Sequence, residues 1–199
     1  MERLIEGALQ DVGDLSRWAS TSREFREFVV AASKLLVECY QNNGKVLVCG
    51  NGGSAADSQH FVGELVGKYS YDRSPLPAIA LTTDTSILSA VGNDYGFDQV
   101  FSRQVMAIGS PGDILIGIST SGSSRNIVEA CSAAHRIGMC VIGLTGSAGG
   151  CLREMSDLCL VVPSRVTPRI QEIHQIAYHL ICHIVEERFF GRESGGLSG

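Results

Sequence analysis

Five short apolar runs, each followed by a turn and then by a helical pattern, constrain the fold of this chain more than any other feature. They are KVLVC, AIALT, DILIGIS, CVIGLT and LCLVVP, at 45–49, 78–82, 113–119, 140–145 and 158–163. Parallel strands are covered by helices on both faces and therefore read as continuous hydrophobic runs. The sequence predicts an α/β three-layer sandwich with a five-stranded parallel sheet and right-handed crossovers.

The helices expected around this sheet follow from the spacing of apolar residues. Intervals of three and four over 1–43 predict amino-terminal helices, with Thr21 or Ser22 as the N-cap between two of them. Further helices are expected at about 54–68, 84–92, 97–109, 123–137 and 150–156, and a last long helix at 167–190. Residues 1–199 would form one domain, with its α/β core and last helix over 45–190 and a flexible tail over 192–199.

Composition narrows the class of protein. Of 199 residues, 44% are hydrophobic, and 16 basic against 21 acidic residues give a net charge of −5 without a long run of either sign, which disfavours nucleic-acid binding. The sequence shows neither a membrane-spanning stretch nor an apolar leader at its start, so we expect a cytoplasmic protein without membrane contact. Seven cysteines without a CxxC pair favour reduced thiols packed in the interior.

The loop after the first apolar run, Gly50–Ala55, leads directly into a helical pattern. Ligands of open α/β sheets bind at the carboxyl ends of strands, and a glycine-rich turn at a helix N-terminus presents N–H groups to an anion. The loop lacks the lysine of a Walker A motif. With Asp84 it also matches the pattern G-x-G-x-x-A, so a nicotinamide cofactor and a tight turn without any ligand stay open as alternatives.

The loop after the third run carries five hydroxyl groups, at Ser119, Thr120, Ser121, Ser123 and Ser124. Five hydroxyls at a helix N-terminus suit a phosphate ester, whereas N-capping alone needs only one. Two such loops at the ends of different strands predict one phosphorylated ligand that lies across the edge of the sheet.

Titratable residues follow on the predicted helices. His60 and Glu64 are spaced i,i+4 on the helix that begins at the first loop, which fits a half metal site, an acid/base pair or a simple exposed pair. The last helix carries a polar stripe of Gln171, Gln175, His179 and His183. His174 and His183 are equally consistent with packing, His135 is expected on a solvated face without a role, and Asn93 and Asp94 read as turn residues that could line the pocket.

Taken together, these segments resemble the sugar isomerase (SIS) domain family and, within it, the bacterial phosphoheptose isomerases. The resemblance rests on CGNGGSAADSQHFVGEL (49–65), VGNDYGFDQVFSRQV (91–105), GISTSGSSRNIVEA (117–130), LTGSAGG (144–150) and RIQEIHQIAYH (169–179). It implies a flavodoxin-like SIS fold and a homotetramer with active sites between subunits. It also implies an aldose–ketose isomerase, an intramolecular oxidoreductase that converts sedoheptulose 7-phosphate to D-glycero-D-manno-heptose 7-phosphate, the first step towards ADP-heptose or GDP-heptose and lipopolysaccharide.

The resemblance also implies roles for individual residues. Glu64 would act as the base and His179 as the acid of an enediol(ate) mechanism. One zinc ion per subunit would be held by His60, Glu64, Gln171 and His179. Substrate would contact Asn51, Gly52, Gly53, Ser54, Glu64, Asn93, Asp94, Ser119, Thr120, Ser121, Ser124 and Gln171.

Some features stand outside this pattern or leave a choice. A carboxylate bound to zinc is a poorer base, so Glu64 would either leave the ion during turnover or serve mainly as a ligand. Lys68 and Pro168 stand where some relatives have arginine and aspartate, and His183 lies outside the family pattern, which favours its packing role.

Two other functions compete with the isomerase. The DnaA initiator-associating protein uses a tetrameric SIS fold as a non-catalytic binding module in replication initiation, and shares the GNGGSAA and RIQE stretches. It lacks counterparts of Glu64 and His179, which a scaffold does not need. A nicotinamide-dependent oxidoreductase would leave the hydroxyl-rich loop at 119–124 unexplained. The isomerase is therefore the favoured interpretation.

Overall fold

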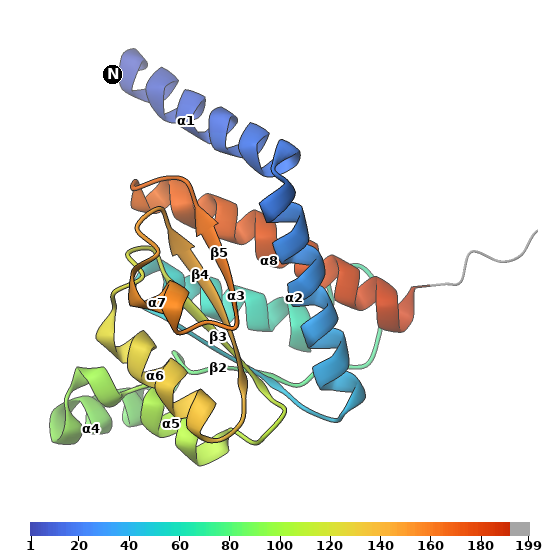
Figure 1. Ribbon diagram of the computed structural model, residues 1–199, viewed down its shortest axis with the longest axis vertical. Helices are drawn as coiled ribbons and strands as arrows, with labels where there is room; N and C mark the ends of the chain where they lie inside the picture. Colours follow the sequence, from blue (N-terminus) through green and yellow to red (C-terminus); the bar gives the residue numbers. More distant parts are fainter. Residues whose placement is uncertain (192–199) are drawn as a thin grey trace, which may run out of the picture.

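A computed structural model describes residues 1–191 and contains the predicted alternation of strands and helices (Figure 1). The predicted tail at 192–199 lies outside the described residues. Most elements begin and end within a few residues of their predicted bounds. In chain order they are α1 (Glu2–Thr21), α2 (Arg23–Gln41), β1 (Val46–Gly50), α3 (Gly53–Val66), β2 (Ala78–Ala80), α4 (Thr85–Tyr95), the 3₁₀ helix η1 (Phe97–Gln99), α5 (Ser102–Ile108), β3 (Ile114–Ser119), α6 (Arg125–Arg136), β4 (Cys140–Gly146), α7 (Gly150–Glu154), β5 (Leu158–Val162) and α8 (Thr167–Phe190).

The strands form one parallel sheet in the order β2-β1-β3-β4-β5, which confirms the predicted fold class. β1 and β3 lie side by side, with Val46 opposite Ile114 and Gly50 opposite Ile118. The chain leaves β1 towards β2 on one side and then returns to place β3 on the other. The carboxyl ends of β1 and β3 are therefore the topological switch point, where open α/β sheets bind their ligands.

Helices cover both faces of this sheet (Figure 1). Successive side chains of a strand point to opposite faces, so Val46 and Val48 pack in a core with α2, α3 and α8. Leu47 and Cys49 pack on the other face in a second core with α5 and α6. This double burial explains why the strands read as unbroken apolar runs.

The amino-terminal helices follow the predicted pattern, and the structure selects one of the two predicted caps. The Ser22 side chain accepts a hydrogen bond from the Phe25 N–H at 3.1 Å and caps α2. α1 projects from the body of the molecule, and Leu4, Ile5 and Leu9 on it are exposed (Figure 1).

Asn93 and Asp94 do not form the predicted turn, because they lie in the last turns of α4. The Asp84 side chain caps this helix by accepting the Ile87 N–H at 2.9 Å. The helix ends at Gly96, whose φ of +89° lies in the left-handed region that glycine adopts without strain. Asp84 thus has a local structural role in place of the cofactor contact that a nicotinamide site would need.

The cysteines and the remaining histidines are divided between core and surface. Cys39, Cys49, Cys131 and Cys182 are buried, Cys140 and Cys159 are partly buried and Cys151 is exposed, and all seven are free thiols. His174 is fully buried, as the packing interpretation predicted. His183 is exposed, and its ring lies 5.6 Å from that of Tyr69. His183 therefore packs against one aromatic ring at the surface and not in the core.

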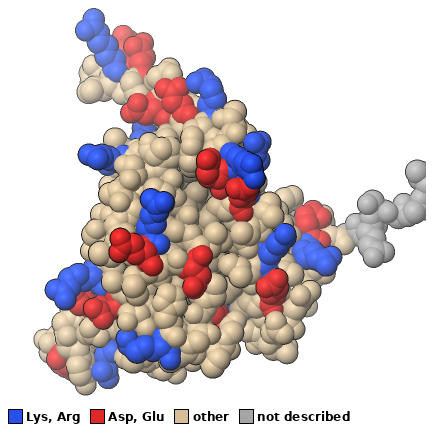
Figure 2. Space-filling model, in the orientation of Figure 1, with Lys and Arg blue, Asp and Glu red and all other residues tan. Residues whose placement is uncertain are grey.

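Two surface properties bear on partners. Figure 2 shows one face of the molecule, on which basic and acidic side chains are interspersed instead of being gathered by sign. Within residues 1–191, no helix combines the length and the apolar character needed to cross a membrane.

Candidate active site

A crevice of about 270 Å³ opens at the carboxyl ends of β1 and β3, where the topology predicts a ligand. Both predicted loops contribute to it, together with the first turns of α8. It is lined by Asn51, Gly52, Gly53, Ser54, Ile118, Ser119, Thr120, Ser124, Thr167 and Gln171.

The glycine-rich loop brings α3 and α8 close together. Gly53 begins α3, and a Cβ atom at this position would lie 2.6 Å from the amide nitrogen of Gln171. The Gln171 amide approaches the Ser54 hydroxyl at 3.4 Å. A side chain at position 53 would therefore displace the Gln171 amide from its place beside Ser54.

The hydroxyl-rich loop is held by bonds among its own side chains. Ser119 Oγ lies 2.9 Å from Ser124 Oγ and 3.3 Å from Ser121 Oγ. Ser124 is the N-cap residue of α6, but its side chain makes no capping hydrogen bond. N-capping, the alternative to anion binding, therefore does not explain the Ser124 hydroxyl. Ser121 Oγ, by contrast, also accepts the Ser123 N–H at 3.2 Å, a local turn contact.

An asparagine pair that the sequence analysis missed joins the two loops. The side-chain amides of Asn51 and Asn126 exchange two hydrogen bonds of 2.9 Å each. Asn126 is buried in the first turn of α6, and a polar residue on an otherwise apolar helix face was the only sequence signal for it. The pair thus links the loop after β1 to the first turn of α6.

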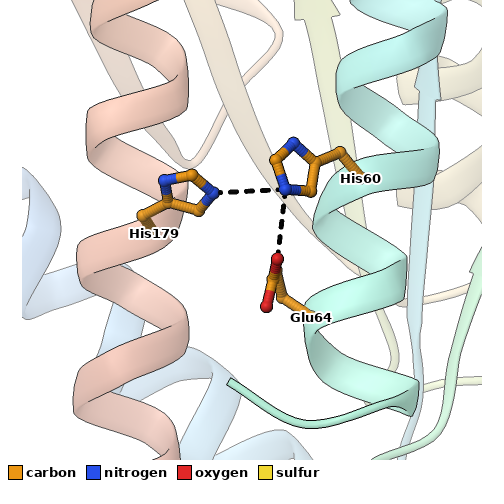
Figure 3. A group of neighbouring side chains, drawn as sticks. All are labelled: His60, Glu64 and His179. Atoms are coloured by element: carbon orange, nitrogen blue, oxygen red, sulfur yellow. Dashed lines mark hydrogen bonds and ion pairs between the residues drawn. The ribbon is translucent and has the colours of Figure 1, made fainter. Parts of the chain in front are cut away.

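A second group of polar side chains lies further along α3 and α8 (Figure 3). His60 Nε2 lies 3.0 Å from Glu64 Oε1 and 3.4 Å from His179 Nε2. One potential ligand atom from each of the three residues lies within 4.8 Å of the other two. We call His60, Glu64 and His179 the cluster.

The cluster has the donor set of a zinc site. Two imidazole nitrogens and a carboxylate are ligands that Zn²⁺ prefers, and they converge on one point between two helices. Burial and the neighbouring His60 lower the pKa of His179, although Glu64 opposes this, and a lowered pKa favours the neutral ring that binds metals. Glu64 is only 22% exposed at its side chain, as expected for a residue that faces a site.

The other side of the His60 ring contacts residues that sequence analysis missed or gave no role. The Tyr178 hydroxyl lies 2.9 Å from His60 Nδ1, and the Gln175 amide nitrogen lies 3.4 Å from the same atom. These contacts fix the ring orientation that points Nε2 at Glu64 and His179. Gln175 belonged to the predicted stripe, whereas Tyr178 had no signal beyond its helical position.

The predicted site residues separate into three groups in the structure. The first loop, three hydroxyl residues and Gln171 line the crevice, while His60, Glu64 and His179 form the cluster. The three hydroxyl residues are Ser119, Thr120 and Ser124; Ser121 does not line the crevice and contacts Ser119. Gln171 contacts Ser54 and not the cluster, because eight residues place it about 12 Å from His179 along the helix axis.

Asn93 and Asp94 join neither the crevice nor the cluster. They are exposed at the end of α4, where the Asn93 amide donates to Asp94 at 2.7 Å. α4 lies on the side of the sheet opposite to α8 (Figure 1), so within this chain these side chains do not line the crevice as predicted.

Comparisons with known proteins identify a family of similar sequences. The SIS domain family model matches residues 15–146. The phosphoheptose isomerase of Sulfurimonas denitrificans is 54% identical over 191 residues, covering 96% of this chain and 98% of the relative. That of Aliarcobacter butzleri is 55% identical over 168 residues, covering 84% and 89%.

Solved structures extend the agreement to three dimensions. Phosphoheptose isomerase GmhA from Neisseria gonorrhoeae is 46% identical with a TM-score of 0.88, and the match covers 94% of this chain and 98% of that one. A phosphoheptose isomerase from Francisella tularensis is 41% identical with a TM-score of 0.89, covering 93% and 97%. The chain therefore belongs to the SIS domain family and, within it, to the phosphoheptose isomerases.

Proposed function

We propose that this protein is an aldose–ketose isomerase that converts sedoheptulose 7-phosphate to D-glycero-D-manno-heptose 7-phosphate. The observation that carries the proposal is the placement of the crevice and the cluster on the same two helices, α3 and α8. A phosphosugar held by its phosphate in the crevice would extend along these helices towards Glu64 and His179. Membership of the phosphoheptose isomerases supports the choice of sugar.

The crevice binds the phosphate through neutral donors in this proposal. Hydroxyl groups of Ser119, Ser121 and Ser124 are already oriented by their mutual contacts. The N-terminus of α3 adds its partial positive charge at Gly53. Asn51, Gly52, Ser54, Thr120 and Gln171 complete the proposed substrate contacts.

The reaction requires two proton transfers, one between neighbouring carbons and one between their oxygens. Glu64 is the proposed base that removes the proton from one carbon and returns it to the next. His179 is the proposed acid that moves the proton between the oxygens. Each group of this kind contributes about 10²- to 10⁴-fold to the rate.

A zinc ion held by His60, Glu64 and His179 is part of the proposal, since their donor atoms fit it. When bound, zinc supplies positive charge that stabilises the enediolate oxygens. Gln171 contacts Ser54 and lies about 12 Å from His179 along α8, so we assign it to substrate binding and not to the zinc ion within one chain. His60, whose ring is oriented by Tyr178, keeps Nε2 directed at the site.

We further propose a homotetramer in the cytoplasm that supplies heptose for glycans such as lipopolysaccharide. Exposed apolar residues support self-association: Leu4, Ile5 and Leu9 on α1, and a hollow of about 560 Å³ between α2 and α8 that Val30, Val37 and Ile184 help to line. In such an assembly, Asn93 and Asp94 would contact the sugar from a neighbouring subunit.

An activity assay tests the proposed function. Purified protein is incubated with sedoheptulose 7-phosphate, with and without added zinc, and aldose formation is followed; the Glu64→Gln variant serves as the matched control. We expect turnover by the wild-type protein that a chelator reduces. Absence of product under every condition would remove the isomerase and favour a non-catalytic binding module. A panel of heptose, hexose and pentose phosphates then identifies the preferred sugar.

A further inference from the structure

The segment between α3 and β2, residues 67–77, is attached to α8 by one buried carboxylate and, at the surface, by the Tyr71 hydroxyl, which donates to Glu187 at 2.6 Å. Glu186 of α8 has a side chain that is 1% exposed and accepts backbone N–H groups from Tyr69, Ser70 and Tyr71 at 2.9, 2.5 and 3.1 Å. Its Oε1 atom also accepts the Arg73 Nε–H at 2.7 Å. Glu186 thus joins three consecutive backbone N–H groups of this segment to α8.

Arg73 connects this carboxylate to the end of α3. Its guanidinium, 2% exposed, donates to the backbone carbonyl of Glu64 at 2.8 Å and to that of Leu65 at 2.9 Å. The last carbonyls of a helix have no partner within the helix. Arg73 therefore caps α3 at the residue that carries the proposed base.

The same carboxylate also affects the surroundings of His179. Glu186 follows His179 by seven residues, two turns along the same side of α8. Because Glu186 binds the Tyr69 N–H, it also holds the Tyr69 ring, whose centroid lies 6.0 Å from that of His179. The carboxyl-terminal parts of α3 and α8 are thus joined by one hydrogen-bonded network, made by Arg73 and Glu186.

Stability alone does not account for a buried ion pair at this position. Two charges lose hydration on burial, and well-packed apolar residues would join the helices at equal or lower cost. A planar guanidinium fork, by contrast, fixes distance and angle between the groups that it joins. Burial by itself would raise the pKa of Glu186, but hydrogen bonds from the Tyr69 N–H and Arg73 outweigh it and lower the pKa, which keeps the carboxylate ionised.

We propose that Arg73 and Glu186 are positioning residues of the proposed active site, which hold the carboxyl end of α3 against α8 so that Glu64 and His179 remain convergent. The inference rests on the proposed function. Neither side chain touches the cluster, and both act through the backbone: Arg73 at the Glu64 carbonyl and Glu186 at the Tyr69 amide.

The chain offers a matched control at the opposite end of the sheet. Asp113 is as buried as Glu186 and accepts the Lys45 N–H at 2.9 Å, the Lys45 ammonium at 2.6 Å and the Ser110 N–H at 2.8 Å. It precedes β3, so it lies at the amino ends of the strands, away from the crevice. Asp113→Asn therefore removes a comparable buried charge without touching α3 or α8.

The test compares Glu186→Gln, Arg73→Lys and Asp113→Asn in the full-length protein. Co²⁺ serves as a spectroscopic probe of the cluster, and its affinity is measured by absorption titration beside Tm, kcat and KM for sedoheptulose 7-phosphate. We expect Tm to be lower in all three variants than in the wild-type protein. Only Glu186→Gln and Arg73→Lys are expected to bind Co²⁺ about 10- to 100-fold more weakly and to lose kcat with little change in KM.

The outcomes separate this inference from the proposed function. The positioning role would be overturned if both Glu186→Gln and Arg73→Lys kept Co²⁺ affinity and kcat within twofold of wild type. It would also be overturned if both variants failed to fold while Asp113→Asn folded, because the pair would then be needed for folding. If the wild-type protein binds Co²⁺ without isomerising heptose phosphate, the proposed function fails. The positioning of the cluster is then still decided by the Co²⁺ affinities.

Discussion

The two ends of the parallel sheet treat their polar groups in opposite ways. At the amino ends of the strands, Asp113 accepts three hydrogen bonds from Lys45 and Ser110, and Asp157 accepts the Val141 N–H at 2.7 Å and contacts His135 at 3.2 Å. At the carboxyl ends, the serine hydroxyls of the 119–124 loop bond one another around a cavity.

The contrast separates structural from functional polar residues in this fold. A carboxylate that accepts backbone N–H groups and pairs with a nearby basic side chain, as Asp113 does with Lys45, stabilises a loop. Hydroxyls that bond mainly one another beside a cavity, as Ser119 and Ser124 do, retain donors for a ligand. Substitutions at the amino ends should therefore change stability, and substitutions at the carboxyl ends should change binding or rate.

The largest effect is expected at Glu64. Glu64→Gln keeps the shape of the side chain but removes the base, so we expect kcat to fall about 100-fold or more. Steady-state kinetics with sedoheptulose 7-phosphate measures this change, and circular dichroism verifies the fold. A near-normal kcat would assign proton abstraction to another residue and leave Glu64 as a ligand.

His174 is an exception to the difference between the two ends of the sheet. It lies near the carboxyl ends of the strands, but it is fully buried and should affect stability. Its Nε2–H donates to the Thr145 carbonyl at 3.2 Å, and burial lowers its pKa from 6.5 to about 4 in spite of this bond. Between these values the unfolded chain binds a proton that the folded protein does not. Stability is therefore fully present above pH 6.5 and falls as the pH drops towards 4, by about 3 kcal/mol from this residue.

Denaturant unfolding across that pH window measures the His174 contribution. His174→Gln retains a donor for the Thr145 carbonyl but does not titrate, so the variant should show a shallower loss of stability at low pH. An identical pH dependence in wild type and variant would show that His174 remains protonated or solvated in the folded protein.

Much of the fold and the crevice could be predicted from the sequence because both follow from local patterns. Apolar runs located the strands, and parallel strands end at the same edge, so the loops at Gly50 and Ser119 had to meet. Two members of the cluster followed from the same kind of pattern, since His60 and Glu64 lie one turn apart on the helix that starts at the first loop. His179 was joined to them only by the family resemblance.

The remaining features depend on the relative placement of distant segments. Asn51 and Asn126, or Arg73 and Glu186, pair across 75 and 113 residues without any spacing rule that links them. The helix predicted at 84–92 continues to Tyr95, and the positive φ at Gly96 that follows it is a property of the folded loop. Gln171 could be separated from the cluster only once α8 was placed along α3.

Asp113→Asn examines the amino end of the sheet directly. The carboxylate gathers two backbone N–H groups and the Lys45 ammonium, which remains partly exposed and can be rehydrated. We expect the free energy of unfolding to fall by about 2 kcal/mol, the value of hydrogen bonds to a charged group. kcat and KM should stay at wild-type values, and a loss of activity beyond the loss of folded protein would contradict the division between the two ends.

The smallest effect is expected at Ser124 in the hydroxyl loop. Ser124→Ala removes one oriented hydroxyl without disturbing α6, because the side chain does not cap that helix. Loss of one hydrogen bond to a charged phosphate should raise KM about tenfold, which corresponds to ~1.4 kcal/mol of binding free energy. Tm should change little. Inorganic phosphate should weaken as an inhibitor by a similar factor. A lowered Tm with unchanged KM would reverse the assignment, because it would make this hydroxyl a structural group like the carboxylates at the opposite end.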